Sequence, residues 1–570
     1  MAALLWPKPN PKAALSSYRP RPAATLTFNK DIAPIFFQNC SGCHRPTQSG
    51  PFAILSYADA KEHGKQIAEV TRKRVMPPWK PEPGLVEYLD ERRLTVDQIG
   101  MVQQWFAEGM HEGDPSDLPA LPQFANGWQL GQPDLVIEMP EAYTLPAEGK
   151  DVYRNFVIPI PIDGPRFVDA VEFRPNAQVV HHAAIRLDNT RMSRKLDEQS
   201  PEPGFEGMTM PETTYFPNGQ FLNWQPGKSA YHSPEGYYWT LGTNTDLVLQ
   251  LHMKPSGKAE AIQASVGFYF TDKAPTRQGF KLILDNPTID IPAGEANYKL
   301  KDSYTLPVDA ELTTIFPHAH YLAREMQSYA ILPDGTKRWL IDIKDWDFNW
   351  QGDYRFAQPI VAPKGSVLHM EFTYDNSTNN VRNPNHPPKR VQFGLQTTDE
   401  MGELWIQALP ASPHDLSLLA EDFSQQGLLK MVKVGQHRVQ KTPKDAKAHL
   451  DLAKTLVGME RLHEALKHLN TAVTLQPKNE EAHYFLGVVN RLNGNRKAAR
   501  SEFEATLQLN ASHYKAHGNL GMLDLEDGKV APAESHFQEA LRINPEDPLA
   551  REKLERIALF RREGKIPLTR

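Results

Sequence analysis

The chain has 570 residues, which at roughly 100 to 200 residues per domain predicts several domains rather than one compact core. Hydrophobic residues make up 40% and charged residues 23%, and no run approaches the roughly 18 apolar residues of a membrane-spanning helix. A net charge of -6 gives no support for nucleic-acid binding or for a polybasic membrane anchor. With only two cysteines, a disulfide-stapled secreted domain is excluded.

The N-terminal part of the chain divides into three segments. Residues 1–24 are rich in Pro, Ala and Arg and lack the apolar core of a secretory signal, so we expect a disordered leader. Residues 25–113 show helical periodicity and predict a small helical domain. Residues 114–134 contain four prolines and are interpreted as a linker.

The helical domain contains a C-x-x-C-H motif formed by Cys40, Cys43 and His44. Its two thiols can bond covalently to the vinyl groups of haem while the histidine binds the iron. Half of a zinc site and a redox dithiol are the alternatives. Zinc would need a ligand from elsewhere, and a thioredoxin-type dithiol would need a βαβ setting that the flanking sequence lacks. The motif therefore favours haem c.

The sequence Met76-Pro77-Pro78 follows an amphipathic helix predicted over residues 61–74 and offers a thioether as the second axial ligand. A methionine buried in the core is the alternative interpretation, and Met101 and Met110 are rival ligands. The segment resembles a class I cytochrome c domain. Because haem attachment of this kind takes place outside the cytoplasm, the resemblance implies a periplasmic or otherwise extracytoplasmic protein whose export signal is absent from this numbering.

Short alternating runs divided by Pro, Gly, Asn and Asp extend from residue 135 to residue 412 and predict strands. Roughly 275 residues of this pattern predict two tandem β-sandwiches. We expect the first sandwich over 135–275 and the second over 276–412.

Histidines of this β region fall in three groups. His181 and His182 are adjacent, so on a regular strand they point to opposite faces and would share a metal only through strand distortion or different ring nitrogens. His252 follows Leu-Gln-Leu at the end of a predicted strand. His318 and His320 are two residues apart, which puts both rings on one face of a strand.

A methionine completes the pattern. Met401 ends the sequence Thr-Thr-Asp-Glu-Met, and a thioether beside imidazoles favours copper, especially Cu(I). With the His-His pair, the Leu-Gln-x-His strand, the His-x-His strand and Asp-Glu-Met in this order, residues 135–410 resemble the copper type II, ascorbate-dependent monooxygenases, the family of peptidylglycine alpha-hydroxylating and dopamine beta-monooxygenases. The resemblance implies that both β-sandwiches are of the jelly-roll type and that the protein hydroxylates a C–H bond with O2 and two copper ions. It assigns the electron-transfer copper to His181, His182 and His252, and the catalytic, oxygen-activating copper to His318, His320 and Met401.

The sequence departs from this family at the substrate site. The enzyme that acts on peptidyl-glycine clamps the substrate carboxylate with arginine, asparagine and tyrosine, whereas this chain has Phe316, Glu403 and Trp405 at those places. We expect a small-molecule substrate that is not a glycine peptide: apolar or aromatic, with a basic group facing Glu403. In the alternative interpretation, Phe316 and Trp405 belong to the core and Glu403 is exposed.

The fused cytochrome predicts that an external donor supplies electrons through the haem to the first copper. Two alternatives remain: a non-catalytic periplasmic electron-transfer or copper-binding protein, and an enzyme in which the haem is a sensor. The first alternative would dock to its partners through the C-terminal region.

Helical periodicity returns after residue 412, with a connector over 413–444 and a repeat over 445–565. Four register positions show a period of 34 residues: Ala465, Ala499 and Ala533; Leu469, Phe503 and Phe537; Gly487 and Gly521; Pro477 and Pro545. The region resembles three tetratricopeptide repeats with a capping helix, an α-solenoid. The resemblance implies a concave surface for a protein partner, and a stability or oligomerisation appendage is the alternative.

Overall fold

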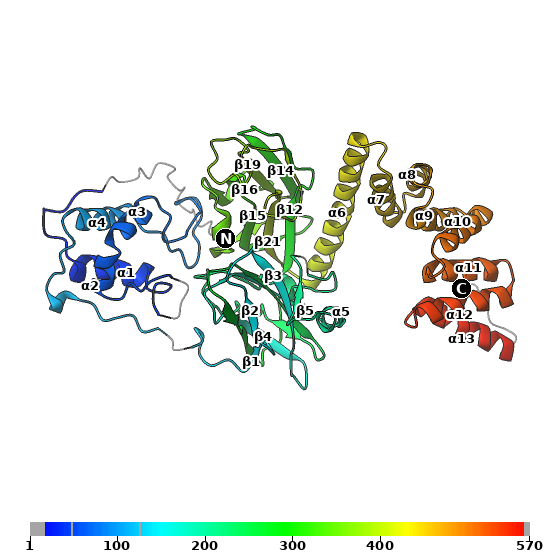
Figure 1. Ribbon diagram of the computed structural model, residues 1–570, viewed down its shortest axis with the longest axis horizontal. Coiled ribbons are helices and arrows are strands. Elements are labelled where there is room, and N and C mark those ends of the chain that lie inside the picture. The colour runs from blue at the N-terminus through cyan, green and yellow to red at the C-terminus, as the bar shows by residue number, and fades with distance from the viewer. Residues whose placement is uncertain (1–17, 47–49, 125–126, 209, 564–570) are drawn as a thin grey trace, which may run out of the picture. The chain divides into compact units, whose positions relative to one another are not determined.

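The computed structural model describes residues 18–563 except 47–49, 125–126 and 209 (Figure 1). The chain divides into two compact units, Met1–Glu421 and Asp422–Arg570. No helix among the described residues is long and apolar enough to cross a lipid bilayer.

The first unit begins with a small group of helices. Two of them start at capping boxes, in which the side chains of Ser56 and Thr95 accept the backbone N–H groups of Asp59 and Gln98. Rings of Phe28, Phe36 and Trp105 pack in their common core. The elements are η1 Phe28–Ile32, α1 Ala33–Asn39, α2 Tyr57–Glu62, α3 Gly64–Arg72, α4 Val96–Ala107 and η2 Pro115–Asp117.

Part of the segment expected to be a disordered leader is described. Tyr18 Oη and the backbone N–H of Arg21 both donate to the Gln104 side chain of α4, at 2.6 and 2.9 Å. Residues 1–17 lie outside the described residues.

Residues 135–271 form a first group of strands. A four-stranded sheet of order β1-β11-β4-β8 and a five-stranded sheet of order β6-β3-β9-β5-β7 contribute side chains to one core, among them Phe268 from the first sheet and Leu249 from the second. A small β10-β2 sheet adds Leu145 and Ile262 to the same core. The elements are β1 Leu135–Glu138, β2 Tyr143–Leu145, β3 Val152–Pro159, β4 Arg166–Arg174, β5 Val180–Asp188, α5 Met192–Glu198, β6 Phe205–Glu206, η3 Pro217–Gly219, β7 Asn223–Trp224, β8 Trp239–Leu241, β9 Asp246–Met253, β10 Glu260–Ile262 and β11 Ser265–Thr271.

Residues 280–410 form a second group of strands. Two four-stranded sheets have the orders β12-β21-β15-β18 and β14-β19-β16-β17, and β13 pairs with β20. Leu282, Leu312, Met326 and Phe372 from these sheets are fully buried. The elements are β12 Phe280–Asp285, β13 Asp290–Ile291, β14 Tyr298–Thr305, β15 Ala310–Ala319, β16 Ala323–Ile331, β17 Lys337–Ile343, η4 Phe348–Trp350, β18 Tyr354–Ala362, β19 Val367–Tyr374, β20 Val391–Gln392 and β21 Gly402–Pro410.

The segment 79–93, here called the strap, connects α3 to α4 and contacts the second group of strands. Pro81 and Tyr88 form isolated antiparallel bridges with Ile343 and Phe356. The buried Tyr88 Oη also donates to the carbonyl oxygen of Leu340 at 2.7 Å. The strap therefore attaches the N-terminal helices to strands about 250 residues further along the chain.

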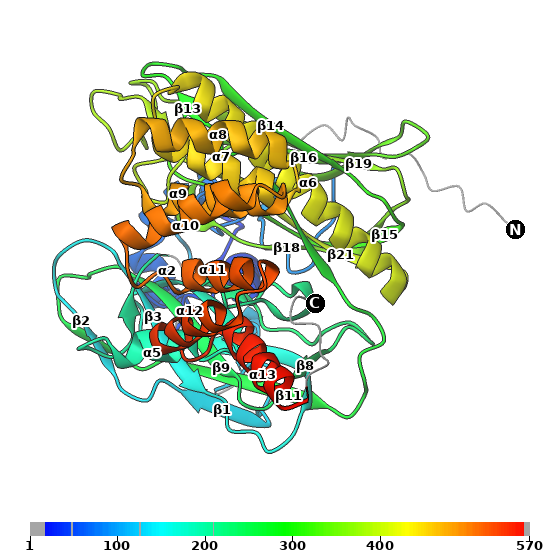
Figure 2. The same ribbon diagram turned by 90° about the vertical axis from the view of Figure 1, so that its right-hand side faces the viewer.

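The second unit is helical. Figure 2 shows α9 beside α10 and α11 beside α12, and these successive helices pack as pairs. Gly487 and Gly521 allow the close approach, because a Cβ atom there would lie 2.6 Å from the ring of Phe503 and 2.9 Å from that of Phe537. The helices are α6 Pro413–Lys441, which begins in the first unit, α7 Ala446–Gly458, α8 Leu462–Leu475, α9 Glu480–Leu492, α10 Arg496–Leu509, α11 Tyr514–Glu526, α12 Val530–Ile543 and α13 Pro548–Glu563.

Candidate metal centres

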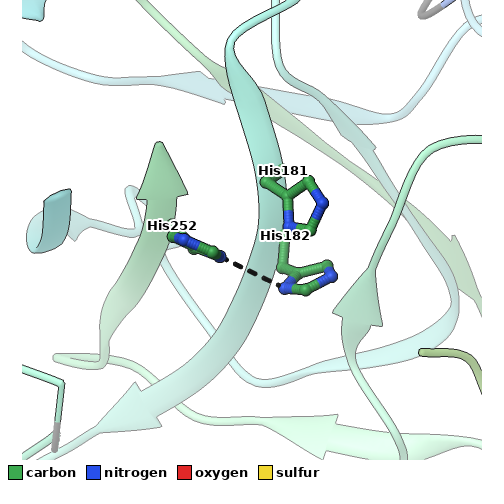
Figure 3. Close-up of side chains that lie close together, drawn as sticks. All are labelled: His181, His182 and His252. Atoms are coloured by element: carbon green, nitrogen blue, oxygen red, sulfur yellow. Dashed lines mark hydrogen bonds between the residues drawn. The ribbon is translucent and has the colours of Figure 1, made fainter. Parts of the chain in front are cut away.

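The first histidine cluster lies on two neighbouring strands. His181 and His182 extend from β5 and His252 from β9, and one ligand nitrogen from each lies within 4.8 Å of the others (Figure 3). His182 pairs directly with His252, and the register between the strands shifts between Val180 and His182. This irregularity lets adjacent residues turn their rings to the same place, which a regular strand would not allow.

Hydrogen bonds orient the ring of His252. Its Nε2 lies 2.9 Å from a carboxylate oxygen of Asp151, and the ring stacks on Tyr153 with centroids 4.2 Å apart. The opposite nitrogen, Nδ1, is 3.4 Å from Nδ1 of His182. A carboxylate on the outer nitrogen with the inner nitrogen turned toward other rings is the arrangement of metal-ligating histidines.

Two further nitrogens of this cluster fit a metal. Among the residues described, Nδ1 of His181 and Nε2 of His182 are buried and have no hydrogen-bond partner. Burial, followed by repulsion from His252, lowers the pKa of His181 to about 4, and burial lowers the pKa of His182 well below its usual value. Both rings are therefore neutral at pH 7, the protonation state that binds a metal ion. The residues present fit a copper ion.

The second cluster lies where β15 and β21 run side by side. The rings of His318 and His320 have centroids 5.4 Å apart, and Ala319, between them, pairs with Gly402. Met401 directly precedes Gly402, so the pairing brings its backbone to the end of β15. The Met401 side chain is only 8% exposed.

In both rings of this cluster, one nitrogen lies within hydrogen-bond distance of an oxygen atom. Nδ1 of His318 lies 2.5 Å from Oε1 of Gln351, and Nδ1 of His320 lies 3.1 Å from the carbonyl oxygen of Asp399. In both rings these contacts lie on Nδ1, and the backbone of Gln396 also hydrogen-bonds the His320 ring. Burial, then repulsion from His318, lowers the pKa of His320 to about 4, so this ring is also neutral at pH 7. Two imidazoles, with Met401 directly before the Gly402 that pairs beside them, are a donor set that fits copper.

Glu400 is a structural component of the second cluster for which the sequence predicted no role. Its buried carboxyl group accepts backbone N–H groups from His320 at 2.5 Å and from Leu322 and Met401 at 2.9 Å each. Burial raises the pKa of Glu400 to about 8, although the three donors favour the ionised form. Glu400 therefore links the end of β15 to the start of β21. Glu400 lies within the Asp-Glu-Met sequence, from which only Met401 was predicted to have a role.

The C-x-x-C-H residues also fit their expected cofactor. Cys40 and Cys43 are free thiols, and burial raises the pKa of Cys40 to about 12. Nδ1 of His44 lies 3.1 Å from the carbonyl oxygen of Phe52, which leaves Nε2 for an iron atom.

A cavity of about 580 Å³ opens beside the motif. Cys40, Cys43, His44 and Met76 line it from the helical side, and His181 lines it from the first group of strands. Its lining is mostly apolar, as a buried porphyrin requires. The rival ligands of Met76 do not line this cavity but pack against the core of the helices: Met101 and Met110.

The three residues expected at the substrate site share one face. Phe316 pairs with Trp405 and His318 pairs with Glu403 across β15 and β21. Phe316, Glu403 and Trp405 are each partly buried, and Trp405 Nε1 donates to Glu403 at 2.9 Å. They are thus neither core residues nor fully exposed, and they lie next to the metal-ligand candidate His318.

Comparison with known proteins identifies the C-terminal region. A family model described as tetratricopeptide repeat matches residues 450–500 and 493–548. Two solved structures, titled "Crystal structure of MamA" and "Crystal structure of MamA protein", are each 19% identical with TM-scores of 0.23. They cover 25% of this chain and 83% and 78% of their own chains. No curated protein matches. The C-terminal region therefore carries tetratricopeptide repeats, and this prediction from the 34-residue period is confirmed.

Proposed function

We propose that this protein is a copper-dependent monooxygenase that hydroxylates a C–H bond of a small molecule with O2. The observation that carries the proposal is that His252, 70 residues from His182 in the sequence, joins His181 and His182. The pairing of β15 with β21 likewise supports it, because it brings the backbone of Met401 to the strand end that carries His318 and His320. Each cluster contains the residues assigned to one copper by the family resemblance.

The chain's own residues would perform distinct tasks at the two clusters. His181, His182 and His252 would hold one copper, while His318, His320 and Met401 would hold the other. The thioether stabilises Cu(I), and copper bound there supplies one-electron redox chemistry and O2 activation. Asp151, Gln351 and the carbonyl of Asp399 would accept hydrogen bonds from ring N–H groups and so keep the imidazoles in the tautomer and orientation that bind metal.

The N-terminal helical region would pass electrons from an external donor to the first copper. Cys40, Cys43, His44 and Met76 would hold haem c, which exchanges one electron at a time with an external donor. His181 lines the same cavity, which supports a route from the haem site to the first copper cluster. Because such haem is attached outside the cytoplasm, we propose an extracytoplasmic location.

The test is O2 consumption that depends on substrate and yields one hydroxylated product per O2. Met401→Leu removes the thioether at nearly constant volume and should abolish turnover while copper at the three-histidine cluster remains. Met326→Leu changes a fully buried methionine elsewhere in the second group of strands and should keep full activity. Unchanged hydroxylation in Met401→Leu would contradict the assignment.

A second candidate is a non-catalytic electron-transfer or copper-binding protein. The tetratricopeptide repeats favour it, since such repeats bind protein partners. Substrate-dependent O2 uptake separates the candidates, because only the monooxygenase consumes O2 with formation of a hydroxylated product. One haem without copper would support an electron carrier.

A further inference from the structure

A row of aromatic rings leads away from the second metal cluster. The ring of Phe316 stacks on His318 with centroids 6.3 Å apart and an interplanar angle of 8°. The ring centroid of Trp405 lies 5.2 Å from that of Phe316, and the centroid of Phe216 lies 6.0 Å from that of Trp405. Phe216 precedes η3 in the first group of strands, whereas the other rings belong to β15 and β21. Both groups of strands therefore contribute to one apolar surface beside the ligand candidate His318.

Two cations lie over the far end of this row. Nζ of Lys281, from β12, is 4.3 Å from the ring centroids of both Phe216 and Trp405. The guanidinium carbon of Arg186, from β5, is 4.8 Å from the centroid of Phe216. Cations over ring faces are attracted by the π electrons, so the rings hold both head groups in place. We call Phe216, Phe316, Trp405, Arg186 and Lys281 the aromatic-cationic cluster.

The charges in this cluster do not balance. Glu403 is the carboxylate that acts on both cations, and it accepts the Trp405 indole N–H. Within the described part of the chain, neither Arg186 nor Lys281 forms an ion pair within 4.0 Å, and Nε of Arg186 is buried without a hydrogen-bond partner. Burial and then repulsion from Arg186 lower the pKa of Lys281 to about 8. Two partly desolvated cations beside one carboxylate are favourable for an added anion.

We propose that the aromatic-cationic cluster selects the substrate, a small aromatic or apolar molecule whose anionic group is held by Arg186 and Lys281. The apolar body would lie along Trp405 and Phe316 and lead toward His318. This inference rests on the proposed function and names the substrate class of that site. The expectation drawn from the sequence was a substrate with a basic group facing Glu403. The structure instead places Arg186 and Lys281, both distant from Glu403 in the sequence, close enough to interact with its carboxylate.

The test compares two probes of equal length and opposite charge, 3-phenylpropionate and 3-phenylpropylamine. Binding to the full chain, freed of copper, is measured by isothermal titration calorimetry. We expect the acid to bind at least about tenfold more tightly than the amine. Arg186→Gln and Lys281→Met should each weaken acid binding by about tenfold, and Lys281→Arg should restore most of it.

A matched control comes from the same half of the protein. Nζ of Lys337 lies 3.6 and 3.7 Å from the ring centroids of Tyr329 and Trp339, so it repeats the arrangement of one lysine over two rings at another place. Lys337→Met should therefore leave acid binding unchanged. Equal binding of acid and amine, or acid binding unchanged in both Arg186→Gln and Lys281→Met, would overturn the proposal.

The two proposals fail in different ways. Selective acid binding without hydroxylation of any bound acid would leave the anion site standing and remove the monooxygenase. Hydroxylation of uncharged compounds at rates unaffected by Arg186→Gln and Lys281→Met would leave the monooxygenase standing and remove the anion site.

Discussion

The metal-ligand candidates combine burial with one occupied ring nitrogen. His252, His318 and His320 each have one ring nitrogen beside an oxygen atom, and the second nitrogen of His252 faces a nitrogen of His182. Burial alone would favour neutral rings, but the oxygen partners also fix the orientation of each ring. Asp151 and Gln351 could not be chosen from the sequence, because nothing in their local pattern distinguishes them from other polar residues.

Burial of His320 predicts how the metal-free protein responds to acid. The pKa of His320 is about 4 in the folded chain and about 6.5 in the unfolded chain. Between these pH values the unfolded chain therefore binds a proton at this residue and the folded chain does not. The stability contribution is complete above about pH 6.5 and is lost as the pH falls toward 4. His320→Gln should reduce this loss by about 1–3 kcal/mol, as measured by urea unfolding across this range.

The exposed His386 provides the control for this measurement. His386→Gln should leave the pH dependence as it is in the unchanged protein. A pH dependence that is identical in the unchanged protein and in His320→Gln would show that His320 is not buried as a neutral ring.

At the scale of elements, one carboxyl group joins β15 to β21. The sequence predicted the shared face of His318 and His320 because a strand repeats every two residues. It could not predict that Glu400 accepts N–H groups at both strand ends, since the bonded residues are about 80 positions apart.

Glu400→Ala should therefore damage the second cluster selectively. It would leave three buried N–H groups without their acceptor, lowering the free energy of unfolding by about 2–4 kcal/mol. Copper should be lost from the second cluster and kept at the first, as measured by copper content and electron paramagnetic resonance. Glu311→Ala, which removes a half-exposed ion pair with Arg277, should change neither quantity. Equal losses of copper from both clusters would count against a local role of Glu400.

The strap links the N-terminal helices to the second group of strands. Tyr88 is 7% exposed and stacks on Phe356 with centroids 5.8 Å apart. Tyr88→Ala should detach the strap, at a cost of about 3 kcal/mol in the packing of this segment. We expect faster hydrogen exchange over residues 79–93, while Tyr88→Phe, which keeps the ring, should show an intermediate rate. Exchange as slow in Tyr88→Ala as in the unchanged protein would mean that other contacts hold the strap.

At the scale of the whole molecule, the chain forms two units with separate cores. A substitution in the repeats should therefore melt the second unit earlier and leave the first unchanged. Gly521→Ala would place a Cβ atom 2.9 Å from the ring of Phe537 and should cost about 1–3 kcal/mol. Gly458→Ala, in a helix with open space around the glycine, is the control. Calorimetry should show one shifted and one unshifted transition; an equal shift of both transitions would contradict this independence.

How much could be predicted from the sequence depends on the range of the contacts. The helix pairs of the repeats could be predicted, because Gly521 and Phe537 are close in the sequence and recur at a fixed period. The strap and the aromatic-cationic cluster could not, because Tyr88 meets Leu340 and Arg186 meets Phe216 only after distant segments have folded together.

Copper content per chain tests the central claim most directly. The protein is loaded with copper, freed of unbound metal and analysed by inductively coupled plasma mass spectrometry. We predict about two copper ions per chain, falling to about one in His252→Ala and to about one in His318→Ala, each loss confined to its own cluster. A copper content that stays the same in both variants, or a protein that retains no copper, would contradict the account.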